Sequence, residues 1–462
     1  MTTLSLLRQT DDMAGLFDTI EQVPLRHLSQ DRPQDPKARP TVDDDKVQFE
    51  SFMGAGQTDI LDKTVRLGTF LRQRQDTNTT GAIEQSLGVQ LLEAAAPRAA
   101  ICNRDGERQN VIMLGSNSYL DLTRHPQVIT AAKSALEHYG YGMGAVSLYA
   151  GITDLHRKLE QAIADFCGTE DAIVFPGGYG TNVGVISALC GPGDVIINDS
   201  ANHASIFDGS RLSGADCKLY PHGNMKRLEQ VLRRLPAEQK GRLIITDGVF
   251  SMHGDLARLD VITELAEQYK ARVMVDDAHG IGIVGPGGRG TAAEFGVADK
   301  IDLHVSMLSK APGGLGGYCA ARADTVRFLR FYARTYFFST ALPAPIVAGL
   351  YQVFQLLAAD AAGREKLWEN IRYMQNGIQD LGFSTTPPTS GIIPVIVGDE
   401  AKLAALHRAL LNLGVYTNIV TYPAVRRKEC RLRLCIMASL TKEDMDTALA
   451  AFETAGAKCG IR

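Results

Sequence analysis

Short apolar runs alternate with helical periodicity between residues 109 and 342. The runs are bounded by turn residues and predict buried strands at 111–114, 172–175, 194–197, 242–246, 272–275 and 303–307. Apolar positions at helical spacing lie between them and predict helices at 128–138, 225–234 and 261–269. Strands that alternate with helices predict an α/β fold with a mostly parallel sheet covered by helices. We take 109–342 as one large domain.

The pattern differs on either side of this region. Beyond Pro343, helices at 346–357, 366–381 and 442–455 and strands at 392–397 and 431–436 predict a smaller C-terminal α+β domain, residues 343–462. At the other end, residues 1–50 are expected to form an N-terminal extension with a short helix at 16–23 and a polar, proline-rich linker at 29–40. Residues 51–108 are expected to form a helical segment, because 59–74 carries an apolar helix face.

Composition narrows the function classes. The net charge of -4 argues against nucleic acid as the main partner, and no apolar run approaches the length of a membrane span. The N-terminus lacks the basic and apolar pattern of a signal peptide. The eight cysteines are scattered without metal-like spacing. These features predict a cytoplasmic protein with reduced thiols.

Lys310 lies between the apolar strand 303–307 and the glycine cluster 313–317. A lysine held out of water at a strand end loses its proton readily and can form a Schiff base. A surface lysine before a glycine turn explains this stretch alone equally well.

Asp276 follows the strand 272–275, where a carboxylate is costly unless it serves a ligand, a cap or a cation. It suits the protonated nitrogen of a pyridine ring, and His279 lies three positions on, where it can support that ring. Metal ligation is the competing interpretation. No third ligand with convincing spacing lies nearby, so no metal is expected.

Two further strand ends carry candidate groups. The glycine turn 176–182 opens a helix whose N-terminal N–H groups suit a phosphate, although a purely structural turn is an alternative. His203 follows the strand 194–197 and suits stacking on an aromatic cofactor, although many such histidines are structural. A lysine for an aldehyde, an aspartate for a pyridinium, a phosphate turn and a stacking imidazole together predict pyridoxal 5'-phosphate (PLP) as the cofactor.

Eight short motifs then occur in the order of a known family. They are 116–120 (SNSYL), 140–144 (GYGMG), 202–205 (NHAS), 247–252 (DGVFSM), 275–279 (VDDAH), 309–311 (SKA), 338–343 (FSTALP) and 431–433 (RLR). With them the chain resembles the α-oxoamine synthases from about residue 109 to its C-terminus. This branch of the fold-type-I PLP enzymes includes glycine C-acetyltransferase, 8-amino-7-oxononanoate synthase, 5-aminolevulinate synthase and serine palmitoyltransferase.

The resemblance implies roles in cofactor binding and catalysis. Lys310 would hold PLP as a Schiff base and act as the base, Asp276 would pair with the pyridine nitrogen, and His203 would stack on the ring. The remaining cofactor contacts implied are Ser251 and His279 near the ring oxygen and Gly178 and Tyr179 at the phosphate.

The resemblance also implies substrate and subunit contacts. Asn117 and Arg433 would hold the carboxylate of an amino acid, for which a guanidinium is suited because it binds in two-point fashion. Ser339 and Thr340 would reach the phosphate bound to a neighbouring subunit. A homodimer with active sites at the subunit interface is therefore expected.

The chain departs from the family pattern at four positions. Met307 and His253 stand where a threonine and an aspartate are usual, and Ser147 and Leu440 stand where several relatives have an arginine and a histidine. Met307 lacks the threonine hydroxyl that would contact the cofactor phosphate. The last two leave the substrate and the acyl donor open.

The expected reaction is a decarboxylative Claisen condensation of glycine, alanine or serine with an acyl thioester, carried on coenzyme A or on an acyl carrier protein. It would give an α-aminoketone, carbon dioxide and free thiol. The nearest alternative is a PLP-dependent aminotransferase on the same fold. A non-catalytic partner subunit is a second alternative, but such a chain would be expected to lack Lys310.

Overall fold

The structure is a computed structural model that describes residues 61, 63–65, 89–103, 106–236, 241–359, 361–422 and 424–461. The chain divides into two compact units, Met1–Phe70 and Leu71–Arg462. In the first unit the described residues are Leu61 and the helical residues 63–65, where the Thr64 hydroxyl donates to the Leu61 carbonyl oxygen over 2.6 Å. The expected helix at 16–23 and the linker at 29–40 lie outside the described residues.

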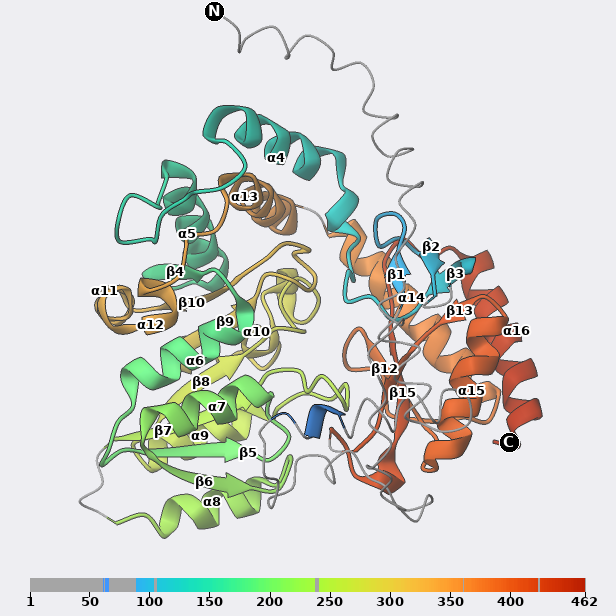
Figure 1. The fold of residues 1–462 in the computed structure, drawn as a ribbon. Helices are drawn as coiled ribbons and strands as arrows, with labels where there is room; N and C mark the ends of the chain where they lie inside the picture. The colour runs from blue at the N-terminus through green and yellow to red at the C-terminus, as the bar shows by residue number, and fades with distance from the viewer. Residues whose placement is uncertain are drawn as a thin grey trace, which may run out of the picture. The chain divides into compact units, whose positions relative to one another are not determined.

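The second unit contains a seven-stranded sheet of order β4-β10-β9-β8-β7-β5-β6 (Figure 1). Strands β6, β5, β7, β8 and β9 run parallel to one another, and β10 runs antiparallel to both β9 and β4. This confirms the expected α/β fold with a mostly parallel sheet. The strands are β4 (Asp171–Phe175), β5 (Val195–Asp199), β6 (Asp216–Tyr220), β7 (Arg242–Asp247), β8 (Arg272–Asp276), β9 (Leu303–Met307) and β10 (Gly317–Ala321).

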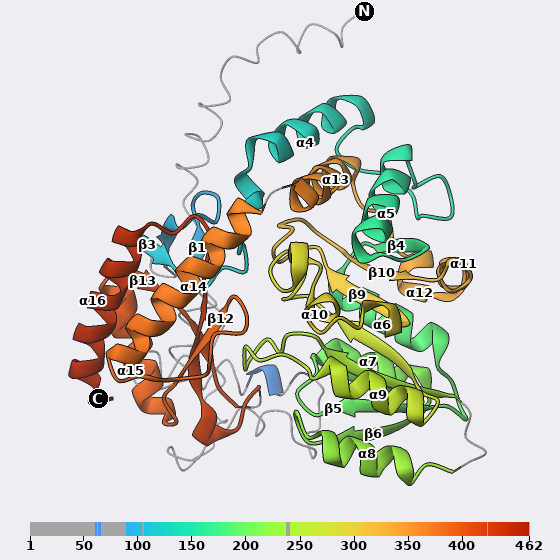
Figure 2. The ribbon, with the colours of Figure 1, turned by 180° about the vertical axis from the view of Figure 1, so that it is seen from behind.

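Helices cover both faces of this sheet because its strands are apolar on both sides (Figures 1 and 2). On β5, Ile196 belongs to a core cluster with apolar residues of α6 and α7, whereas Val195 and Ile197 belong to a cluster with α8 and α9. A third cluster joins α5 and α13 to β4 and β10. The helices are α4 (Pro126–Tyr139), α5 (Asp154–Cys167), α6 (Gly178–Leu189), α7 (Ala204–Ser213), α8 (Met225–Arg233), α9 (Leu259–Gln268), α10 (Thr291–Glu294), α11 (Ala323–Tyr332), α12 (Arg334–Phe337) and α13 (Ala344–Ala359).

The C-terminal region builds a second sheet, of order β11-β12-β15-β14. Strand β15 lies between β12 and β14 and is antiparallel to both, and its buried residues pack with apolar residues of α14, α15 and α16. The elements are α14 (Ala362–Asp380), β11 (Ser384–Thr385), β12 (Ile392–Ile396), α15 (Glu400–Asn412), β13 (Val415–Tyr416), β14 (Asn418–Val420), β15 (Arg431–Cys435) and α16 (Lys442–Cys459).

A third sheet corrects the expectation that 51–108 is helical. Within that segment β1 (Gln90–Leu91) and β2 (Arg98–Cys102) are strands, and they continue through β3 (Arg108–Met113) to β13. The side chains of Ala99 and Ile101, two residues apart, are both buried in a small core. This period of two is that of a half-buried strand rather than that of a helix. The domain boundaries at 50, 108 and 342 stay a prediction.

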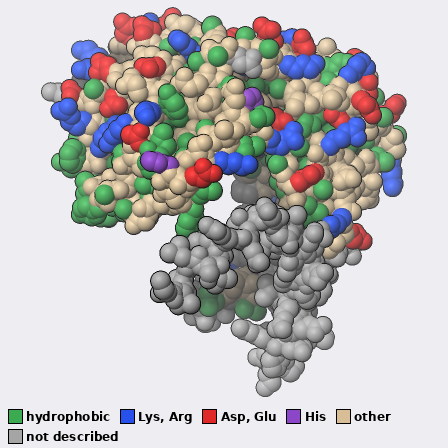
Figure 3. All heavy atoms as spheres, turned by 90° about the horizontal axis from the view of Figure 1, so that it is seen from above, with side chains coloured by type: hydrophobic (Ala, Val, Ile, Leu, Met, Phe, Trp, Pro, Cys, Tyr) green, Lys and Arg blue, Asp and Glu red, His purple; other side chains and the backbone are tan. Residues whose placement is uncertain are grey.

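Short 3-10 turns complete the described elements, at η3 (Leu122–Arg124), η4 (Pro286–Gly288), η5 (Ala298–Lys300) and η6 (Arg427–Glu429). Basic and acidic side chains are interspersed on the face drawn in Figure 3. Among the described helices no single one is long and apolar enough to cross a membrane, whereas α13 and α14 pass the criteria of length and composition only as a pair bent by 78°.

Candidate active site

A cavity of about 170 Å³ lies at the carboxyl ends of the parallel strands. Its lining includes Asp247, Asp276 and Met307, the last residues of β7, β8 and β9. Parallel strands end together at one edge of a sheet, which is where ligands bind in open α/β folds. The other lining residues are Gly178, Tyr179, His203, Val249, Ser251, Ala278, His279, Ser309 and Lys310. Seven of the eleven sequence-predicted site residues therefore meet here.

Lys310 enters this cavity from the turn that follows β9. The turn is closed by hydrogen bonds from Gly313 N to Lys310 O (2.9 Å) and from Gly314 N to Leu308 O (2.7 Å), and Gly313 has a φ of 72°, which favours glycine. Burial, and then the positive charge of Arg433, lower the pKa of Lys310. Both effects favour the neutral amine, the form that attacks a carbonyl.

Asp276 is buried beside a second carboxylate, because it is paired in register with Asp247 on β7. Its Oδ2 accepts from Asn182 Nδ2 at 2.6 Å and its Oδ1 from the backbone N–H of Ala278 at 3.1 Å. Desolvation raises the pKa of both carboxyl groups, and the neighbouring Asp276 adds to the rise at Asp247, whose pKa lies well above its ordinary value. Two carboxylates this close do not both ionise readily, so the proton belongs on Asp247 and the charge on Asp276.

His203 caps α7 at the rim of the cavity. Its Nδ1 lies 2.7 Å from Ser205 Oγ, and its backbone N–H donates to Asp247 Oδ1 at 3.3 Å. The ring of Tyr179 meets it edge to face at 6.1 Å between centroids. The imidazole is thereby oriented while the residue stays exposed, which leaves it accessible for stacking on a flat ligand.

Helix α6 begins at Gly178, and its N-cap, Gly177, supplies no side-chain cap. A Cβ at Gly178 would collide with the Met307 thioether. The free backbone N–H groups at such an uncapped helix N-terminus form a binding site for an anion. Met307, one of the four residues that depart from the family pattern, packs beside this helix start.

His279 is buried, with its Nδ1 2.8 Å from the hydroxyl of Tyr119. Burial lowers its pKa well below the ordinary value, and the charge of Arg433 lowers it further. The ring is consequently neutral, and the Tyr119 contact fixes its orientation. Ser251 lies in the loop after β7 and also lines the cavity.

Arg433 lies on β15 of the second sheet and donates from its Nη2 to Asn117 Oδ1 at 2.6 Å. Burial opposes its charge, but Cys435 and Tyr119 raise its pKa overall. Its Nε is buried and has no hydrogen-bond partner within the described chain. A buried guanidinium with a spare donor is suited to a carboxylate.

Ser339 and Thr340 do not line the cavity. Thr340 forms an isolated bridge with Val146, and Ala341 N donates to Ala145 O at 3.1 Å, so the two segments lie side by side. Asn117 and Arg433 are likewise outside the immediate lining, although Arg433 is close enough to influence both Lys310 and His279.

The residues of this cavity fit PLP. The uncapped start of α6 suits the phosphate, buried Asp276 suits a cationic ring nitrogen, and the depressed pKa of Lys310 suits a Schiff base with the aldehyde.

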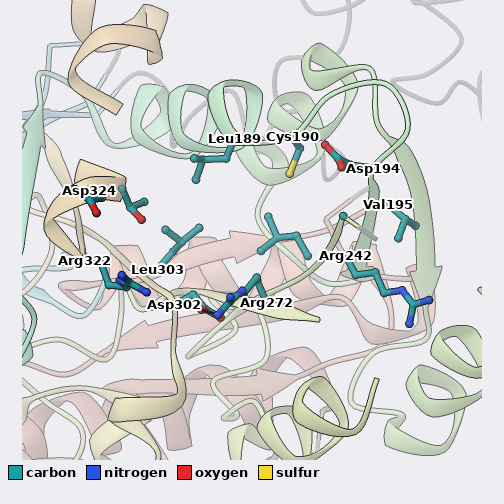
Figure 4. A pocket seen from close by; sticks show the side chains of 13 residues that line it. Leu189, Cys190, Asp194, Val195, Arg242, Arg272, Asp302, Leu303, Arg322 and Asp324 are labelled. Atoms are coloured by element: carbon teal, nitrogen blue, oxygen red, sulfur yellow. Dashed lines mark hydrogen bonds and ion pairs between the residues drawn. The ribbon is translucent and has the colours of Figure 1, made fainter. Parts of the chain in front are cut away.

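A larger cavity, of about 340 Å³, lies at the opposite edge of the sheet (Figure 4). It is lined by Val195, Arg242, Arg272 and Leu303, the first residues of four parallel strands. Arg272 is paired there with Asp302 at 2.7 Å. The groups with the chemistry of a PLP site line the smaller cavity, which we therefore take as the active site despite its size.

The fold and this cavity define a fold-type-I PLP-dependent transferase. The family model "Aminotransferase class I and II" matches residues 109–452. An 8-amino-7-oxononanoate synthase from Thermoanaerobacter pseudethanolicus is 41% identical over 392 residues, 85% of this chain and 98% of that protein. The 4-hydroxy-2,2'-bipyrrole-5-methanol synthase PigH from Serratia sp. is 37% identical over 90% of this chain and 63% of its own length.

Among solved structures, a serine palmitoyltransferase variant from S. paucimobilis with PLP and myriocin bound superposes with a TM-score of 0.82. It is 33% identical, and the match covers 87% of this chain and all of that one. The chain belongs to the class I and II aminotransferase family, and within it to the α-oxoamine synthases. It is a PLP-dependent acyltransferase of the condensing type.

Three residues of the site escaped the sequence analysis. Asn182 donates a hydrogen bond to Asp276, Asp247 lies beside Asp276 on the neighbouring strand, and Tyr119 orients His279. Tyr119 and Asp247 lie inside recognised motifs, but nothing in their spacing showed what they would contact.

Proposed function

We propose that this enzyme condenses glycine, alanine or serine with an acyl thioester, carried on coenzyme A or a carrier protein, to give an α-aminoketone, carbon dioxide and free thiol. One observation carries the proposal. The buried guanidinium of Arg433, held by Asn117 and with Nε unpartnered in the described chain, lies close enough to Lys310 to lower its pKa. A carboxylate bound there would hold an amino acid beside the reacting amine.

The proposed mechanism assigns each group one task. Bound PLP supplies the electron sink that makes the Cα proton of the amino acid removable. Arg433 and Asn117 bind the carboxylate and so orient the Cα bonds. The Lys310 amine, neutral because of its lowered pKa, takes the proton from Cα.

Other residues hold the cofactor. The Asp276 carboxylate, fixed by Asn182, would keep the ring nitrogen protonated, and Gly178 and Tyr179 would bind the phosphate. His203 would stack on the ring and Ser251 and His279 would contact its oxygen. These roles rest on their common cavity and on the family resemblance.

We further propose a homodimer with its active sites at the interface. Tyr141, Tyr149 and Phe338 are 88%, 71% and 71% exposed, which is unusual for aromatic side chains in one neighbourhood. The backbone contacts between Ala145–Val146 and Thr340–Ala341 bring the segments of these aromatics together, next to Ser339. A partner covering this surface would receive Ser339 and Thr340 at its own phosphate site. A cytoplasmic location remains part of the proposal and is supported by the scattered cysteines, which are all free thiols.

The test mixes the purified holoenzyme with each small amino acid, with and without an acyl thioester. We expect release of free thiol and carbon dioxide in equal amounts, with one amino acid preferred. Lys310→Ala should abolish both, whereas Lys300→Ala, a matched change at a half-exposed lysine, should not. Formation of a keto acid and the amine form of the cofactor without thiol release would instead establish the aminotransferase alternative.

A further inference from the structure

Two histidines and a carboxylate gather outside the active-site cavity, where the turn after β6 meets the loop after β7. His222 lies in the first segment, and His253 and Asp255 lie in the second. Each offers one ligand atom, and these atoms all lie within 4.8 Å of one another. His253 stands where the family usually has an aspartate, so the cluster in this chain has one imidazole more than the family pattern.

The spacing is close to that of a metal site. Ligand atoms about 2.0–2.1 Å from a tetrahedral zinc ion lie roughly 3.3 Å from one another. His222 Nε2 and Asp255 Oδ2 are already 3.1 Å apart. The rings of His222 and His253 are tilted by 34° relative to each other, with centroids 4.7 Å apart, so the second imidazole lies beside this pair.

Two polar atoms of the cluster lack partners. His253 Nδ1 and Asp255 Oδ1 are buried, and neither has a hydrogen-bond partner within the described chain. Buried polar atoms without partners are costly and call for an explanation such as an ion. The side chains of His222 and Asp255 are 24% and 45% exposed, which leaves an entry path and room for a water ligand.

A further carboxylate orients His222 from behind. Asp199 Oδ1 lies 3.1 Å from His222 Nδ1, and Asp199 is itself buried and fixed by the N–H groups of Ala201 (2.8 Å) and Gly223 (2.9 Å). Histidines that bind metals characteristically donate their other ring N–H to such a carboxylate, which directs the free nitrogen at the ion.

We propose that His222, His253 and Asp255 bind a divalent transition-metal ion such as Zn²⁺, with water completing its coordination. Two imidazoles and one carboxylate are a ligand set that such ions take. The site is distinct from the PLP cavity, but its loop also carries Ser251. Arg431 holds the Met252 carbonyl oxygen at 3.2 Å and Ser390 holds that of Gly254 at 2.8 Å, so the ion would fix a loop already tied to the C-terminal region. Its role is to hold this loop.

The experiment uses untagged holoenzyme, treated with EDTA, dialysed, and titrated with Zn²⁺ at constant pH. Bound metal is measured by equilibrium dialysis and atomic emission, and the same titration with Co²⁺ is followed through its visible ligand-field bands. We expect one ion per chain. His253→Ala should lose stoichiometric binding, and Asp199→Asn should weaken it about 10- to 100-fold, as expected when the carboxylate behind a ligating histidine is removed.

His125→Asn is the matched control, because His125 also has a buried, unpartnered Nδ1 but belongs to no ligand group among the described residues. It should bind metal like the unaltered enzyme. The absorbance of bound PLP checks that each variant is folded. Substoichiometric binding in the unaltered enzyme, or undiminished binding in His253→Ala, would overturn the assignment and leave a shared proton as the link between His222 and Asp255.

Discussion

At the scale of single residues, the two carboxyl groups at the ends of β7 and β8 differ in protonation: Asp276 carries the negative charge and Asp247 carries the proton. Asp276 accepts hydrogen bonds from the Asn182 side-chain amide and from the backbone N–H of Ala278. The pKa of Asp247, in contrast, is raised by burial and by the charge of Asp276. Asp276→Asn should therefore remove the charge and lower kcat/KM by about 10²-fold or more, the size of one lost electrostatic contact at a reacting group. Asp247→Asn replaces a neutral group by a neutral one and should cost less than about tenfold.

Both variants are compared in steady-state kinetics and in PLP titrations by absorbance. Asn at 247 can still accept the His203 N–H, so the pair is matched in shape. Equal losses in the two variants would show that the charge is shared between the carboxyl groups, contrary to the assignment.

The same residues show what a sequence can and cannot reveal about a site. Lys310, Asp276 and His203 were predictable because each follows a strand and has a chemistry that PLP needs. Asn182 lies five residues after the N-cap Gly177, within α6, where an amide looks like any helical polar residue. Its hydrogen bonds to Asp276 and Ser205 arise only because α6 and α7 pack on the same face of the sheet.

At the scale of elements, the start of α6 depends on one glycine. Gly178→Ala adds a methyl group that would collide with the Met307 thioether, and we expect PLP affinity to fall about tenfold, equivalent to about 1.4 kcal/mol. Gly180→Ala, in the same helix, would meet Thr335 at an ordinary 3.5 Å and should leave affinity unchanged. Combining Gly178→Ala with Met307→Ala should restore binding. Absorbance titration of the apoenzyme measures all three, and a Gly180→Ala defect as large as that of Gly178→Ala would contradict this account.

The turn after β8 should make stability depend on pH. Desolvation raises the pKa of the buried Asp277 to about 7 against the opposing hydrogen bond from Thr291 N. The folded state then holds a proton between about pH 4 and 7 that the unfolded chain releases, so stability falls as pH rises through this window. At about 1.4 kcal/mol per pKa unit the loss amounts to a few kcal/mol.

Asp277→Asn removes this titration. Urea unfolding of both proteins between pH 4 and 8 should show the unaltered chain losing stability relative to the variant as pH rises. A constant difference across that range would mean that Asp277 does not titrate there.

Elements with a strong pattern could be predicted closely, whereas those defined by distant partners could not. Strand β9 has the predicted bounds, and the strands β4, β7 and β8 differ from prediction by one residue at an end. Strand β10 was missed because it follows a glycine cluster and its small residues, Gly317–Ala321, resemble a continuing loop. Its strand character comes from two antiparallel neighbours, β4 and β9, far apart in sequence.

At the scale of the whole molecule, the proposed dimer implies that each active site draws on two chains. Lys310 and Asp276 belong to one chain's cavity, whereas Ser339 and Thr340 lie outside it, beside the exposed Phe338. If Ser339 and Thr340 serve the neighbour, a defect in Lys310 and a defect in this pair fall in the same site when they are carried on different chains.

Mixing the two defective proteins tests this directly. A dimer of one Lys310→Ala chain and one Ser339→Ala/Thr340→Ala chain would contain one site with both defects and one site with none. Random exchange makes half of the dimers mixed, so about a quarter of full activity should return. Thiol release after co-refolding measures it, and sedimentation velocity checks that dimers form. Both parents alone should be defective, and a mixture no more active than their average would mean that Ser339 and Thr340 act within their own chain.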